Sequence, residues 1–228
     1  MAAVAVPCIY TRPRPSSSFS NSMMMQAASK KKLLLLESPA AYASDAMQSY
    51  VLDEAGRPSK QWIQKVLKGQ QESDQVKWSD LDFLLLPDTH RTNRGGGPDQ
   101  SWFKTTLNWL CIPRDCSLRS LRDLRGEHVG LLEKMLRESL GCIEAETGIP
   151  ADEVMAYVHY PPSVYHLHVH FAYPYGQQTH RDPFRMHSLA SVIENLRLDG
   201  GYYERISLHV PVHADTCLSS ILTKAGRS

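Results

Sequence analysis

The sequence has 228 residues, of which 42% are hydrophobic and 21% are charged, so it is neither a wholly disordered nor a collagen-like chain. Its 25 Lys and Arg residues nearly balance 24 Asp and Glu residues, and this formal net charge of +1 argues against a basic face that wraps duplex nucleic acid. No apolar run approaches the roughly 20 residues of a membrane helix, and the five cysteines include no CxxC pair. We therefore expect a soluble, intracellular protein that binds neither membranes nor duplex nucleic acid.

The first 36 residues differ in composition from the rest of the chain. Residues 1–36 contain no Asp or Glu, are rich in Ser and Met, and carry the run Lys30-Lys31-Lys32. This composition is typical of an organelle transit peptide, and it is equally typical of a disordered tail. Both interpretations stay open. The predicted domain organisation is a tail over 1–36, a segment that leads into the sheet over 37–100, and a domain over 101–228.

The rest of the chain alternates between helical and extended patterns. In chain order we predict a helix at 60–67, strands at 80–86 and 102–112, a loop at 91–99, a helix at 127–146, strands at 154–158 and 165–172, a helix at 185–196 and a strand at 203–212. Strand–helix–strand alternations are too few for a doubly wound parallel sheet. The predicted fold class is α+β, with a mainly antiparallel sheet of about five strands and packed helices.

Three histidines alternate with apolar residues in the predicted strand at 165–172. His166, His168 and His170 are therefore expected on one face of the strand, and Leu167, Val169 and Phe171 on the face that packs into the core. Three interpretations of the histidine face compete. It is a solvated surface, a partial metal site, or a catalytic face in which one imidazole attacks phosphorus while its neighbours hold the anionic oxygens.

The segment 166–172, His-Leu-His-Val-His-Phe-Ala, resembles the motif of the histidine triad superfamily of nucleotide hydrolases and transferases. Three further segments, at 120–128, 159–165 and 187–196, resemble the scavenger mRNA-decapping enzymes of that superfamily, in their C-terminal catalytic domain. The likeness extends from about residue 37 to residue 218. It implies a histidine-triad-like α+β domain that needs no cofactor and no metal.

The resemblance also implies a reaction and its residues. His168 would attack a phosphate of the 7-methylguanosine cap and form a nucleotidyl-histidine intermediate, which releases a nucleoside or RNA diphosphate. Water would then release 7-methylguanosine monophosphate, as a step of mRNA decay. His166, His170 and His159 would assist His168. The implied phosphate-binding residues are His159, Tyr160, Pro161, Pro162, Ser163, Tyr165, His166, His170 and Arg185.

The same resemblance implies a pocket for the cap base. A 7-methylated guanine is a cation, which an aromatic face attracts, and a carboxylate accepts two hydrogen bonds from the guanine edge. Trp62 and Glu72 match the stacking tryptophan and base-reading glutamate of the family, and Pro87 and Asp88 match its cap-binding Pro-Asp pair. His90 stands where the family has a lysine. Taken alone, Trp62 has the pattern of a helix core residue and Glu72 that of a solvated charge.

The family carries an N-terminal domain that closes on the cap, and we expect nothing of that length in this sequence. Either the sequence is part of a longer protein, or a reduced enzyme works with an open pocket, which would bind cap more weakly. The implied substrate is cap dinucleotide or short capped RNA. The implied assembly is a homodimer, and the implied location is cytoplasm and nucleus, with organellar targeting left open. The alternatives are a broader dinucleoside polyphosphate hydrolase of the same superfamily, a cap-binding protein without turnover, and a metal-dependent enzyme.

Overall fold

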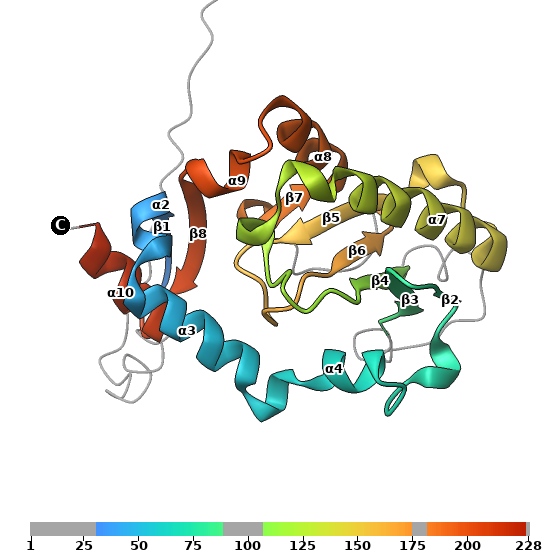
Figure 1. Ribbon diagram of the computed structural model, residues 1–228, viewed down its shortest axis with the longest axis horizontal. Coiled ribbons are helices and arrows are strands. Elements are labelled where there is room, and N and C mark those ends of the chain that lie inside the picture. Colours follow the sequence, from blue (N-terminus) through green and yellow to red (C-terminus); the bar gives the residue numbers. More distant parts are fainter. Residues whose placement is uncertain (1–30, 89–106, 175–181, 227–228) are drawn as a thin grey trace, which may run out of the picture.

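The structure is a computed structural model, and it describes residues 31–88, 107–174 and 182–226 (Figure 1). The strands are β1 (Lys32–Glu37), β2 (Trp78–Ser79), β3 (Phe83–Pro87), β4 (Asn108–Pro113), β5 (Met155–His159), β6 (Val169–Ala172), β7 (Met186–Ser188) and β8 (Leu208–His213). The α-helices are α2 (Pro39–Ala43), α3 (Asp45–Gly56), α4 (Trp62–Leu67), α7 (Val129–Thr147), α8 (Leu189–Leu198), α9 (Tyr202–Arg205) and α10 (Cys217–Ala225). Short 3₁₀ turns connect several of these elements.

Six of the strands form one antiparallel sheet in the order β2-β3-β4-β6-β5-β7. This arrangement confirms the α+β prediction and the antiparallel pairing. β6 lies in the interior of the sheet, between β4 and β5, so both of its edges are hydrogen-bonded to neighbours. A side chain on β6 therefore has a backbone fixed from both sides.

The two faces of the sheet carry different helices because the strand side chains alternate. On β3, Phe83 and Leu85 pack into the cluster that contains the buried faces of α7 and α8. Leu84 and Leu86 pack into a second cluster with α4. Figure 1 shows α7 and α8 over one face of the sheet and α4 on the opposite side. The face that carries α4 is also the face of the histidines.

β1 and β8 form a separate two-stranded antiparallel sheet, in which Leu35 is paired with Val210. The assignment of residues 32–36 to a tail was therefore wrong. Leu33 and Leu35 pack against the core while Leu34 and Leu36 are exposed, which is the alternation of a half-buried strand. Figure 1 shows these blue N-terminal elements beside the red C-terminal ones.

Several predicted bounds need correction. The predicted helix at 185–196 begins only at Leu189, because Met186–Ser188 pairs with β5 as an edge strand. The predicted strand at 203–212 begins at Leu208, after the helical turn of α9, and it lies in the two-stranded sheet. The helix at 127–146 is confirmed as α7, and Gly148 terminates it with a φ of 69° that favours glycine. The predicted loop at 91–99 and residues 102–106 of a predicted strand lie outside the described residues.

The described part of the chain includes no helix with the length and apolar composition of a membrane span.

Candidate functional site

The histidine motif enters the sheet only in its second half. His170 lies on β6 between Leu110 of β4 and Tyr157 of β5, whereas His166 and His168 precede the strand. The predicted strand at 165–172 therefore begins at Val169. The predicted alternation is confirmed by the odd-numbered apolar residues, because Leu167, Val169 and Phe171 are all buried in the main core.

His168 is held in one tautomer by the backbone of its own motif. Its Nδ1 lies 2.7 Å from the carbonyl oxygen of His166. A carbonyl oxygen only accepts hydrogen bonds, so Nδ1 must carry the proton. In the neutral ring, Nε2 then keeps its lone pair. His168 is buried, yet it lines a pocket, and the lone pair of this tautomer is the kind of group that attack on a phosphate requires.

His166 is fixed by protein groups on both sides of its ring. Its Nε2 donates to the carbonyl oxygen of Pro113 at 2.8 Å, and its Nδ1 accepts from Gln64 Nε2 at 3.1 Å. Burial lowers the pKa of His166 below its ordinary value. The ring is therefore a neutral anchor, and the backbone carbonyl oxygen of the same residue accepts from His168 Nδ1. Because both ring nitrogens contact protein groups, this geometry does not support the prediction that His166 also binds phosphate oxygens.

His159, at the end of β5, forms a pair with His170. Nδ1 of His159 lies 3.0 Å from Nε2 of His170, so one of these nitrogens donates and the other accepts. The ring of Tyr157 stacks on His170 at 5.1 Å and 10°, and the ring of His168 lies 5.0 Å away at 66°. The structure thus brings together the nucleophile candidate and two of its predicted assistants.

A cavity of about 390 Å³ opens in front of these histidines. The predicted site residues that line it are Trp62, Asp88, Ser163, His168 and His170. Its size falls in the range of sites for small ligands. The lining also includes Ser59, Gln71 and Leu110, which the sequence analysis did not single out. The aromatic face, a carboxylate and the histidines therefore share one pocket, although they come from segments far apart in the chain.

Asp88 lines the pocket and is anchored by Asn108. Its Oδ2 accepts from Asn108 Nδ2 at 2.9 Å, and its backbone N–H donates to the Asn108 carbonyl at 2.8 Å. Pro87 ends β3 opposite Trp109. Glu72, which has a positive φ of 55°, accepts from Gln71 Nε2 at 3.3 Å and lies next to the lining rather than in it. His90 lies outside the described residues.

Two predicted phosphate ligands have side chains that serve another part of the structure. The Tyr160 ring is fully buried, and its hydroxyl donates to Glu37 Oε1 at 2.5 Å. Tyr165 packs edge-on against Tyr50 in the main core, with ring centroids 6.1 Å apart. Alternation of side chains along the chain turns both rings away from the pocket. The phosphate-binding role implied for Tyr160 and Tyr165 therefore stays a prediction, and these ring contacts do not support it.

Of the remaining members of the predicted phosphate-binding set, Ser163 lines the pocket, and Arg185 contacts the turn before it. Arg185 Nη2 donates to the carbonyl oxygen of Pro161 at 2.8 Å and so fixes the turn that continues through Pro162. The Ser163 carbonyl accepts from Lys60 Nζ at 2.8 Å. Lys60 places a cation at the rim that the sequence analysis missed, since a lone lysine before a short helix carries no signal of its own.

Within residues 31–88, 107–174 and 182–226, no group of three or more His, Cys, Asp or Glu side chains is arranged to hold a metal ion.

Acid is expected to destabilise the fold through His166. The unfolded chain binds a proton on this ring near pH 6.5, whereas burial lowers its pKa in the folded state. Stability from the neutral ring is thus present above about pH 6.5 and is lost as the pH falls through the folded pKa. Urea unfolding at pH 7.5 and 5.5 should show a smaller free energy of unfolding at the lower pH. This drop in the free energy of unfolding should be smaller in His166→Asn. It should persist in the control His213→Asn, which changes an exposed ring. Equal drops in the parent and in both variants would contradict this account.

Comparison with known proteins places this site in a family. Residues 61–181, more than half of the chain, match the family model described as "Scavenger mRNA decapping enzyme C-term binding". A protein of Bos taurus named m7GpppX diphosphatase is 34% identical over 177 residues, which are 75% of this chain and 49% of that protein. The m7GpppX diphosphatase of Homo sapiens is 33% identical over the same shares. The chain therefore spans about half the length of the curated relatives it matches.

Two solved structures are weakly similar to this chain. Hnt3 in complex with DNA and guanosine has a TM-score of 0.42 and 15% identity, over 72% of this chain and 93% of that one. A HIT family hydrolase from Legionella pneumophila has a TM-score of 0.38 and 17% identity, over 52% of this chain and 96% of that one. The classification comes from the sequence matches, which cover the C-terminal region of the family's proteins: this chain belongs to the scavenger mRNA decapping enzyme family.

Proposed function

We propose that this chain hydrolyses the 7-methylguanosine cap of a cap dinucleotide or a short capped RNA fragment. The observation that carries the proposal is the tautomer of His168. Its Nδ1 proton is held by the His166 carbonyl, which places the lone pair of the neutral ring on Nε2, and His168 lines the same pocket as Trp62 and Asp88. The names of the relatives, m7GpppX diphosphatase, support the choice of a cap as the substrate.

The proposed reaction has two displacements at one phosphorus. Nε2 of His168 forms a bond to the phosphorus next to the methylated nucleoside, while the bond from that phosphorus to the bridging oxygen breaks. The leaving group departs as a nucleoside or RNA diphosphate. Water then attacks the same phosphorus, the P–N bond breaks, and 7-methylguanosine monophosphate is released. His168 ends in its starting state, so the residue acts as a nucleophilic catalyst.

The groups around His168 would stabilise charge that develops on the phosphoryl oxygens. The His159–His170 pair lies beside His168, and in the proposed reaction an N–H of this pair would donate to a phosphoryl oxygen. Lys60 adds a positive charge at the rim, next to Ser163. The cationic base would stack on Trp62, and Asp88, with Glu72 beside the pocket, would supply carboxylate acceptors for the guanine edge.

Assembly and location complete the proposal as expectations drawn from the family resemblance. We propose a homodimer that acts in cytoplasm and nucleus. Analytical ultracentrifugation of the purified protein tests the first statement, and imaging of the tagged full chain tests the second. A monomer at all concentrations that hydrolyse cap would overturn the dimer.

The base pocket should distinguish methylated from unmethylated caps. With excess chelator present, we expect methylated cap dinucleotide to yield 7-methylguanosine monophosphate and a nucleoside diphosphate, measured by chromatography. Stacking of the cationic base on Trp62 is worth about 1–2 kcal/mol when desolvated, so Trp62→Ala should lower kcat/KM for methylated cap by roughly tenfold or more. The unmethylated substrate should lose much less.

Trp78→Ala serves as the matched control, because Trp78 is a partly exposed tryptophan of β2 and does not line the cavity. Equal rates on methylated and unmethylated dinucleotides would favour the broader dinucleoside polyphosphate hydrolase. Binding of methylated cap without any cleavage would favour a cap-binding protein. Loss of turnover with chelator would favour a metal-dependent enzyme.

A further inference from the structure

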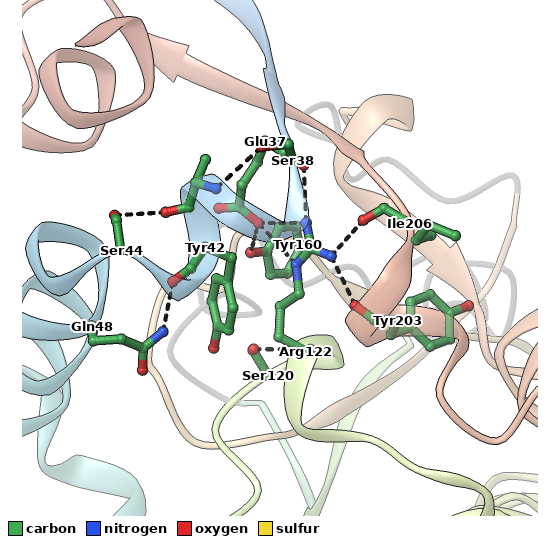
Figure 2. A network of polar contacts seen from close by, with 11 residues as sticks. Glu37, Ser38, Tyr42, Ser44, Gln48, Ser120, Arg122, Tyr160, Tyr203 and Ile206 are labelled. Carbon is green, nitrogen blue, oxygen red and sulfur yellow. Dashed lines mark hydrogen bonds and ion pairs between the residues drawn. The ribbon is translucent and has the colours of Figure 1, made fainter. Parts of the chain in front are cut away.

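A buried ion pair joins the N-terminal strand to the chain that carries the site. Figure 2 shows Glu37, the last residue of β1, facing Arg122 and Tyr160. Arg122 Nη2 lies 2.7 Å from Glu37 Oε1, and the two side chains are only 1% and 0% exposed. The Tyr160 hydroxyl donates to the same carboxylate oxygen. Residues 37, 122 and 160 thus meet at one point of the core.

Arg122 uses its whole donor set inside this network. Its Nε and Nη2 donate to Glu37 Oε1, Nη2 also donates to the Glu37 carbonyl, and Nη1 donates to the carbonyls of Tyr203 and Ile206. The guanidinium lies between two rings, 5.3 Å from the Tyr42 centroid and 5.6 Å from that of Tyr160 (Figure 2). The cation therefore fixes the position of the Tyr160 ring as well as that of Glu37.

Tyr160 connects this network to the histidine site through the backbone. It directly follows His159, whose ring contacts His170 at 3.0 Å, and it precedes the turn that leads to Ser163 in the pocket lining. The Tyr160 N–H donates to the Arg185 carbonyl at 2.8 Å, and Arg185 in turn binds Pro161. The buried side chain of Tyr160 thus anchors the backbone between His159 and Ser163, two residues of the site.

Stability alone does not explain a buried ion pair at this place. Desolvation of two charges opposes their attraction, and well-packed apolar residues often hold a core equally well. Burial raises the pKa of Glu37, against the opposing effects of Tyr160 and Arg122. A charged pair does supply direction, because hydrogen bonds to a fixed carboxylate define where the phenol must lie.

We propose that Glu37 and Arg122 are positioning residues for the histidine site, and that they act through the Tyr160 hydroxyl on His159. The inference rests on the proposed function, which it deepens. It also makes β1, which lies outside the matched family segment 61–181, a working part of the site. None of the three side chains is assigned a contact with substrate.

Tyr160→Phe tests the proposal because it removes one oxygen atom and leaves the ring. We expect kcat on methylated cap dinucleotide to fall roughly tenfold with KM changed less than twofold, since small displacements of a reacting group cost that much or more. Tyr203→Phe is the matched control. It removes the hydroxyl of another buried tyrosine, one that accepts from Asn195 Nδ2 at 3.1 Å, and it keeps the Tyr203 backbone carbonyl that accepts from Arg122. Both variants should melt within a few degrees of each other.

A second measurement does not depend on turnover. In ¹⁵N NMR of histidine-labelled protein, Tyr160→Phe should shift the titration of His159 and His170, whereas Tyr203→Phe should leave both unchanged. Equal kcat in the two variants together with unchanged imidazole titrations would overturn the proposal. If the parent protein does not cleave cap at all, the proposed function fails, and the NMR shift still decides whether Tyr160 positions His159.

Discussion

We expect replacement of His168 by Asn to abolish the proposed cap hydrolysis, with a fall in kcat on the order of 10³-fold or more, because the attacking lone pair would be gone. Asn keeps a side-chain amide that can donate to the His166 carbonyl in place of Nδ1, so local packing should survive. Chromatography of the products formed from methylated cap dinucleotide measures the effect. Affinity for the methylated cap should remain, since Trp62 and Asp88 are unchanged.

The control is the same substitution at an exposed histidine, His209→Asn on β8, where full activity is expected. The intermediate offers an independent check. Brief reaction with cap dinucleotide labelled in its phosphate should attach label to the parent through a P–N bond, which is acid-labile, and should attach none to His168→Asn. Residual turnover above about a tenth of the parent rate would contradict a nucleophilic role for His168.

The alternation in 166–172 was sufficient to predict the core face of the motif. Val169 and Phe171 are buried because β6 is paired on both edges and one face of the sheet is covered by α7 and α8. The residues that share the pocket were harder to predict. Trp62 and His168 lie more than 100 residues apart in the chain, and only the resemblance to a family placed them together. Their roles remain predictions.

Other parts of the site depend on contacts that no local pattern contains. Tyr160 was grouped with the phosphate ligands because its neighbours are, yet its ring is drawn into the core by Glu37 and Arg122, which lie 123 and 38 positions away in the chain. Gln64 shows the same difficulty. It lies on a helix whose apolar residues determined the prediction, while its amide contacts His166, which lies 102 positions away in the chain. β1 was missed because four consecutive leucines do not reveal which two of them are buried.

Replacing Arg122 by Ala should destabilise the fold by about 3–5 kcal/mol, because it leaves the Glu37 carboxylate buried without its cation. The carbonyls of Glu37, Tyr203 and Ile206 each lose a donor in the same change. Urea unfolding at pH 7.5 measures the loss. Arg197→Ala is the matched control, since Arg197 forms ion pairs with Glu133 and Glu194 on the surface, where such pairs contribute about 1 kcal/mol or less. A similar loss in both variants would show that burial does not determine how much the Glu37–Arg122 pair contributes to stability.

The double variant Glu37→Leu with Arg122→Leu separates stability from positioning. With both charges removed, apolar packing replaces the ion pair, and most of the stability lost in Arg122→Ala should return. The return is incomplete because the three backbone carbonyls that accepted from Arg122 still lack that donor. The Tyr160 hydroxyl has also lost its acceptor, so kcat should stay as low as in Tyr160→Phe while the unfolding curve moves back toward that of the parent. Recovery of both properties together would mean that the network contributes to stability alone.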